Sequence, residues 1–135
     1  MIEPEKATQQ ARATDAPRSS WFGWLLIAGY VVGVLVLGLT PGPQLNLGDT
    51  WVPQDKLGHL VVFAGFAALL TAVLRGRRRA LLGVLGSTSL GGALELLQAL
   101  VPYRSAELLD LVADAVGAVL GAGLVGIVRS LRSVN

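Results

Sequence analysis

Four apolar stretches, each long enough to cross a lipid bilayer, constrain the fold of this 135-residue chain more than any other feature. The first covers residues 21–39 and carries no charge, and the others cover residues 57–74, 80–101 and 108–128. At a rise of 1.5 Å per residue, about 20 helical residues match a hydrocarbon core of roughly 30 Å. The mean hydropathy of +0.60 agrees with this, because soluble domains are usually more polar. We therefore predict an all-α, four-helix transmembrane bundle.

The region before the first apolar stretch has a different composition. Residues 1–20 are polar, carry charges of both signs and contain few large apolar side chains. Such a segment cannot bury enough surface to offset the entropy of folding, so we predict a disordered cytoplasmic tail over 1–20 and a four-helix membrane domain over 21–135. A signal peptide would have a shorter apolar region followed by an A-x-A cleavage site, and neither is present.

The basic residues predict the orientation of the bundle. With four spans and an inside N-terminus, nine fall in cytoplasmic segments and only Lys56 and Arg104 fall in outer loops. Short basic loops resist translocation, so we predict that both termini are cytoplasmic and that the protein crosses the cytoplasmic (inner) membrane several times. The same distribution reports topology rather than nucleic-acid binding. The nine are Lys6, Arg12, Arg18, Arg75, Arg77, Arg78, Arg79, Arg129 and Arg132.

Several site chemistries are absent from the sequence. The chain has no cysteine, which excludes a disulfide framework, a thiolate nucleophile and cysteine-ligated metal sites. A single histidine gives no H-x-x-x-H signature, and there is no G-x-S-x-G motif or P-loop. We accordingly expect no cofactor and assign no metal ligands.

Polar residues recur on one face of each of three predicted helices, near their outer ends. Helical rise places His59, Gln98 and Asp110 roughly 5 to 6 Å below the outer boundary, and Glu95 and Asp114 roughly 10 Å. A carboxylate at this depth costs up to about 3 kcal/mol on insertion scales, so these groups should face the bundle interior or a hydrated cavity. The three sets are Asp55 and His59 (i, i+4), Glu95 and Gln98 (i, i+3), and Asp110, Asp114, Gly117 and Gly121 (i, i+4, i+7, i+11).

A structural role competes with a functional one for each of these residues. Polar side chains can hydrogen-bond across helices, and small residues allow backbones to approach closely. Gly29-x-x-x-Gly33 and Gly117-x-x-x-Gly121 are weak motifs for which packing is the default interpretation. Asp110 could also cap the helix that it begins. Concentration of the whole set at one face, with several carboxylates beside one histidine, favours a functional site.

The order of these residues resembles the VanZ-like family of small bacterial membrane proteins, over about residues 55–121. The matching residues are Asp55-Lys56-x-x-His59-x-x-x-Phe63, Glu95-x-x-Gln98, Arg104, Asp110, Asp114 and Gly117. One departure is Asp114, which stands where the family commonly has asparagine. The name-giving member is associated with resistance to the glycopeptide teicoplanin, so the resemblance implies a cell-envelope role for a VanZ-like domain over 21–135.

The first functional hypothesis is a non-enzymatic envelope protein with an outward-facing polar pocket. The pocket binds membrane lipids or a lipid-linked or surface envelope component, with Arg104 and Lys56 meeting anionic groups, and a homo-oligomer is compatible with it. No nucleic acid is expected as a partner. The binding residues in this hypothesis are Asp55, Lys56, His59, Glu95, Gln98, Arg104, Asp110 and Asp114.

Two alternatives stay open. An intramembrane enzyme acting on a lipid would use His59, Glu95 or Asp110 as acid or base, and a metal variant would add Asp114 to these three. We favour a binding protein without catalytic activity over the enzyme. A proton or solute pathway would use the carboxylates as relays, but the cytoplasmic halves of all four spans are apolar.

Overall fold

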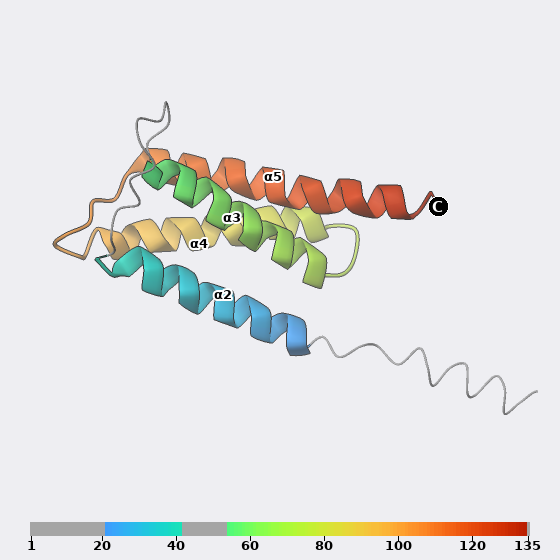
Figure 1. Cartoon of the computed structure of the whole chain (residues 1–135), viewed down its shortest axis with the longest axis horizontal. Helices are drawn as coiled ribbons and strands as arrows, with labels where there is room; N and C mark the ends of the chain where they lie inside the picture. Colours follow the sequence, from blue (N-terminus) through green and yellow to red (C-terminus); the bar gives the residue numbers. More distant parts are fainter. Residues whose placement is uncertain (1–20, 42–53, 135) are drawn as a thin grey trace, which may run out of the picture.

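A computed structural model describes residues 21–41 and 54–134, and this part of the chain forms four helices (Figure 1). They are α2 (Trp21–Leu39), α3 (Gln54–Val73), α4 (Arg79–Gln98) and α5 (Leu108–Arg132). All four are long and apolar enough to cross a membrane. The predicted all-α transmembrane bundle is confirmed, whereas the predicted tail over 1–20 lies outside the described residues.

The helix boundaries differ from the apolar runs at the polar ends of the helices. The bounds of α2 are those of its apolar run, but α3 begins at Gln54 rather than at 57. The α4 helix ends at Gln98 and the chain turns at Ala99 and Leu100. Pro102 then disfavours helical geometry at Val101, so the helix does not resume there. The α5 helix continues to Arg132, whose charge suits the negative end of the helix dipole.

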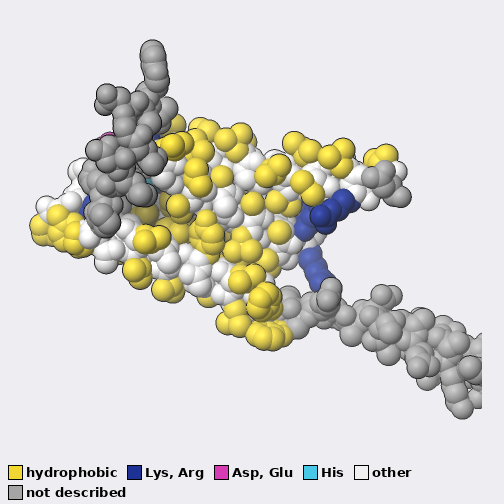
Figure 2. Space-filling view, in the orientation of Figure 1, with side chains coloured by type: hydrophobic (Ala, Val, Ile, Leu, Met, Phe, Trp, Pro, Cys, Tyr) yellow, Lys and Arg dark blue, Asp and Glu magenta, His cyan; other side chains and the backbone are white. Residues whose placement is uncertain are grey.

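Successive helices run in opposite directions, so the bundle has two chemically distinct ends (Figure 1). One end holds the start of α2, the α3–α4 connection and the end of α5, and basic side chains gather there in Figure 2. We call it the arginine end: Arg75, Arg77, Arg78, Arg79, Arg129 and Arg132. The opposite end, which we call the polar end, holds the starts of α3 and α5 and the α4–α5 loop.

The α3 and α5 helices approach each other most closely, through small residues. A methyl group at Gly117 would overlap the carbonyl oxygen of Leu60, and one at Gly121 would overlap that of Ala64. Only glycine permits this contact between the two backbones. The Gly117-x-x-x-Gly121 pair therefore fixes how α5 lies along α3.

The α2 helix packs on the bundle mainly through apolar side chains. Ile27 contacts Phe66 and Leu70 in one buried cluster, and Val34 contacts Phe63 in another. Large apolar side chains cover the flank in Figure 2 and remain exposed in the isolated chain. A surface of this kind is stable against lipid, which is consistent with a membrane protein.

Candidate functional site

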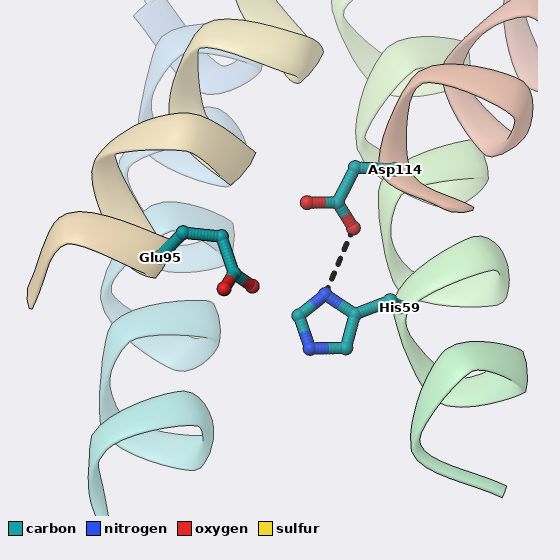
Figure 3. A group of neighbouring side chains, drawn as sticks. All are labelled: His59, Glu95 and Asp114. Atoms are coloured by element: carbon teal, nitrogen blue, oxygen red, sulfur yellow. Dashed lines mark hydrogen bonds and ion pairs between the residues drawn. The ribbon is translucent and has the colours of Figure 1, made fainter. Parts of the chain in front are cut away.

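Three side chains from three helices converge inside the polar half of the bundle (Figure 3). The imidazole Nδ1 of His59 on α3 lies 2.9 Å from Oδ1 of Asp114 on α5, within hydrogen-bond distance. Glu95 on α4 faces the pair, and one ligand atom from each residue lies within 4.8 Å of the other two. We call these residues the His59 cluster.

The His59 cluster contains carboxylate oxygens that have no partner. Asp114 is fully buried and Glu95 is 7% exposed. The backbone N–H of Glu107 donates to Oε2 of Glu95 over 2.8 Å. Oε1 of Glu95 and Oδ2 of Asp114 have no hydrogen-bond partner among the described residues. A buried acceptor without a donor costs about 1–3 kcal/mol, and more if it is charged, so these two oxygens require a donor or a cation.

A second group of charges lies closer to the polar end and is internally compensated. Nζ of Lys56 is 2.7 Å from Oδ1 of Asp110, 2.6 Å from Oε2 of Glu107 and 3.3 Å from Oδ2 of Asp55. We call these four residues the Lys56 cluster. Asp110 is buried, whereas Asp55 and Glu107 are about half exposed. The Lys56 ammonium is thus already occupied by three carboxylates.

The contacts of His59 differ from the grouping expected from the sequence. Helical rise grouped it with Asp110, but the structure pairs it with Asp114, and Asp110 pairs with Lys56 instead. The cause is the helix starts, because α3 begins before Asp55 and α5 begins after Glu107. Each shift of one residue moves a side chain by about 1.5 Å, and together they reduce the expected depth difference between His59 and Asp114 from about 4.5 Å to about 1.5 Å.

Gln98 and Arg104 lie outside both clusters and attach the polar end to α2. Gln98 Nε2 donates to the carbonyl of Gly38 over 3.0 Å, and the Arg104 guanidinium donates to that of Thr40 over 3.1 Å. The hydroxyl of Tyr103 donates to the Leu39 carbonyl over 2.8 Å. Within the described part of the chain, Arg104 forms no ion pair.

The comparison with known families agrees with the resemblance seen in the sequence. The family model described as VanZ/LLP1 matches residues 24–129, which include both clusters. The chain belongs to the VanZ/LLP1 family. No curated protein and no solved structure matches the chain.

Sequence reasoning missed Gly91, which contributes to the His59 cluster of this VanZ/LLP1 chain. A methyl group at Gly91 would overlap Oδ2 of Asp114, so the absence of a side chain at Gly91 leaves space on α4 for the carboxylate. One turn away, the hydroxyl of Ser87 donates to the Phe63 carbonyl over 2.9 Å. The i, i+4 spacing of Ser87, Gly91 and Glu95 was visible in the sequence and could have marked this face of α4.

The chemistry available to the two clusters of this VanZ/LLP1 chain differs. Asp55, Glu107 and Asp110 also lie close enough to share an ion, but Lys56 donates to all three. The His59 cluster combines one imidazole with two carboxylates and holds no Lys or Arg. It can accept hydrogen bonds, hold a proton or ligate a metal.

Proposed function

We propose that this multi-pass VanZ/LLP1 protein lies in the bacterial inner membrane and binds a lipid-linked or surface envelope component at its polar end. The observation that carries the proposal is the pair of buried oxygens on Glu95 and Asp114 that have no hydrogen-bond partner among residues 21–41 and 54–134. Natural bundles rarely leave buried polar groups unsatisfied, and an exception inside a membrane favours a site that a ligand completes.

The two basic residues at the polar end differ in whether acidic side chains already surround them. Three carboxylates already surround Lys56, so it is a poor receptor for an anion. Among the described residues, Arg104 donates only to the Thr40 carbonyl, and its guanidinium has further N–H groups for a ligand. In the proposal, a phosphate or carboxylate of the ligand contacts Arg104, and its polar headgroup reaches toward the His59 cluster.

The proposal requires that the polar end faces outward, as the nine-to-two distribution of basic residues favours. The chain has no native cysteine, so single-cysteine variants report accessibility directly. We expect Ser105→Cys, in the α4–α5 loop, to react with a membrane-impermeant maleimide in intact cells. Ser133→Cys, beyond α5, should react only after permeabilisation. The reverse pattern would overturn the outward orientation.

Binding is tested on purified, detergent-solubilised protein by native mass spectrometry. The probes are phosphatidylglycerol, cardiolipin, undecaprenyl phosphate and a neutral diacylglycerol. We expect selective retention of a phosphate-bearing lipid, reduced at least tenfold by Arg104→Ala. Arg77→Ala, an exposed arginine at the opposite end, is the matched control and should retain the lipid. Equal retention by wild type and Arg104→Ala would contradict the role of Arg104.

We further propose a role in glycopeptide resistance, because an envelope component bound by this protein would be less accessible to teicoplanin. In a susceptible Gram-positive host, expression of the wild type should raise the inhibitory concentration of teicoplanin at least fourfold. Arg104→Ala, present in the membrane at an equal level, should not. An unchanged inhibitory concentration with wild type would remove resistance from the proposal while leaving lipid binding to be judged by mass spectrometry.

The contact between His59 and Asp114 favours a second candidate, an intramembrane enzyme acting on a lipid. A carboxylate that accepts from one imidazole nitrogen orients the ring and leaves the other nitrogen for proton transfer. Glu95 would then serve as the second acid or base. This candidate predicts that His59→Ala abolishes lipid turnover while binding persists; absence of turnover by wild type on the retained lipid would eliminate it.

A further inference from the structure

The His59 cluster has a composition and a geometry that neither a helix contact nor a simple acceptor site explains. Its three side chains come from three different helices and point toward one another (Figure 3). Two of them, Glu95 and Asp114, are at least nine-tenths buried, and each has one carboxylate oxygen without a partner in the described part of the chain. We propose that His59, Glu95 and Asp114 bind a divalent transition-metal ion, with Zn²⁺ as the best fit.

Charge supports a cation at this place. Glu95 and Asp114 bring two carboxylates into the bundle, and the nearby ammonium of Lys56 is engaged by the Lys56 cluster. Burying two such groups without compensation is costly, and a divalent ion makes the site neutral when the imidazole is neutral. The donor set also selects the ion, because imidazole favours zinc and its neighbours over calcium or magnesium.

The distances fit with a small adjustment. Zinc bonds to nitrogen and oxygen are about 2.0–2.2 Å, so ligand atoms around a tetrahedral ion lie about 3.4 Å apart. The ligand atoms of the cluster are within 4.8 Å of one another, and His59 and Asp114 approach to 2.9 Å. Glu95 is free to close the remainder, because the Glu107 N–H holds only its Oε2 and leaves Oε1 available.

Two further features shape the site. Gly91 has no side chain to obstruct Oδ2 of Asp114, which leaves that oxygen between α4 and α5. Phe63, one turn after His59, stacks on its ring with centroids 6.0 Å apart and restricts its orientation. Three protein ligands around zinc leave a fourth position open. This inference rests on the proposed function for the occupant of that position, an oxygen of the bound headgroup, but the ion itself needs no lipid.

Metal binding is tested on the tag-free full chain in detergent, because His59 is its one histidine and a tag would bind metal itself. After chelator treatment and dialysis, Zn²⁺ is titrated calorimetrically and counted by elemental analysis, and Co²⁺ reports coordination by its visible absorption. We expect one ion per chain with micromolar or tighter affinity and a Co²⁺ spectrum of low coordination number. Absence of binding by the folded wild type would overturn the inference.

Variants separate a built site from an acidic surface. We expect Glu95→Gln and Asp114→Asn each to weaken Zn²⁺ at least 100-fold while the helical circular dichroism and the elution volume stay unchanged. Glu107→Gln, in the Lys56 cluster, is the matched control and should change the affinity less than twofold. An equal loss in Glu107→Gln, or undiminished binding by Asp114→Asn, would show a non-specific acidic surface and overturn the site.

The outcomes for the ion and for the lipid are distinguishable. Zinc binding without any lipid retention leaves the metal site standing and removes the proposed function. Lipid retention by a chain that binds no zinc removes the metal site alone, and the two unpartnered oxygens would then be satisfied by headgroup donors or by protons.

Discussion

The chain carries the same Gly-x-x-x-Gly pattern twice, and the two copies have different surroundings. In α5, methyl groups at Gly117 and Gly121 would overlap backbone oxygens of α3. In α2, no atom of the other described helices lies within 4 Å of the position that a methyl group would take at Gly29 or Gly33. The pattern permits close approach but does not create it, and only the α5 copy is used within the monomer.

The difference matters because the α5 copy continues the face that carries the site. Asp110 and Asp114 precede Gly117 and Gly121 at helical spacing, and Leu60, whose carbonyl meets Gly117, directly follows His59. The close approach of α3 and α5 therefore lies beside the contact between His59 and Asp114. Backbone packing at the glycines should determine how well the His59 cluster is assembled.

The largest expected effect comes from Gly121→Leu. Its side chain would occupy the position of the Ala64 carbonyl, which cannot rotate away, so α3 and α5 must separate. We expect the free energy of unfolding, measured by titration with sodium dodecyl sulfate, to fall by about 3 kcal/mol or more. An added Cβ at Gly123 on the same helix would meet no atom of another described helix within 4 Å, so we expect Gly123→Leu not to lower the free energy of unfolding. Similar losses in both variants would mean that the side chain itself disturbs α5.

A smaller effect is expected for Gly117→Ala, which tests the link between packing and site. The added methyl group displaces the backbone at Leu60, and we expect a loss of about 1–2 kcal/mol in unfolding free energy. Because His59 directly precedes Leu60, the displacement should also move His59, and Zn²⁺ affinity measured by calorimetry should fall about tenfold. Unchanged zinc affinity together with lowered stability would separate the glycine contact from the site.

The contrast extends to α4 through Gly91→Ala, where the obstructed group is a side chain. The methyl group would push the Asp114 carboxylate away from its place beside His59. We expect a loss of about 1 kcal/mol in unfolding free energy and a larger relative loss of zinc affinity. Gly92→Ala is the control, since its methyl group would lie 3.9 Å from Leu111, an ordinary contact. Loss of zinc affinity in Gly92→Ala as well would contradict a specific role for Gly91.

These contrasts also explain what the sequence could and could not predict. The four spans follow from bilayer thickness, so their number and approximate extent were predictable from apolar runs alone. That acidic residues gather at the polar end was equally visible. The pairing of His59 with Asp114 was not, because a shift of one residue at each helix start changes which side chains meet.

The basic residues of the polar end illustrate a second limit. That Lys56 and Arg104 meet anionic ligand groups stays a prediction. The sequence did not show that Lys56 donates to three carboxylates or that Arg104 donates to the Thr40 carbonyl. Residue type gives charge and reach, whereas the partner depends on how the starts of α3 and α5 and the α4–α5 loop are arranged. No periodicity in the sequence specifies that arrangement.

The smallest effect is expected for the α2 copy of the glycine pattern. The methyl groups of Gly29→Ala and Gly33→Ala would meet no atom of the other described helices within 4 Å, and alanine is about 1 kcal/mol more favourable than glycine inside a helix. We expect the unfolding free energy to be unchanged or raised by up to about 1 kcal/mol, with zinc affinity unaltered. Gly33→Leu sharpens the test, because a longer side chain would still point to lipid if α2 has no partner there. A destabilisation by Gly33→Leu that grows as the protein-to-detergent ratio is raised would show that α2 packs against a second copy, so that both glycine pairs serve contacts and differ only in which chain they meet.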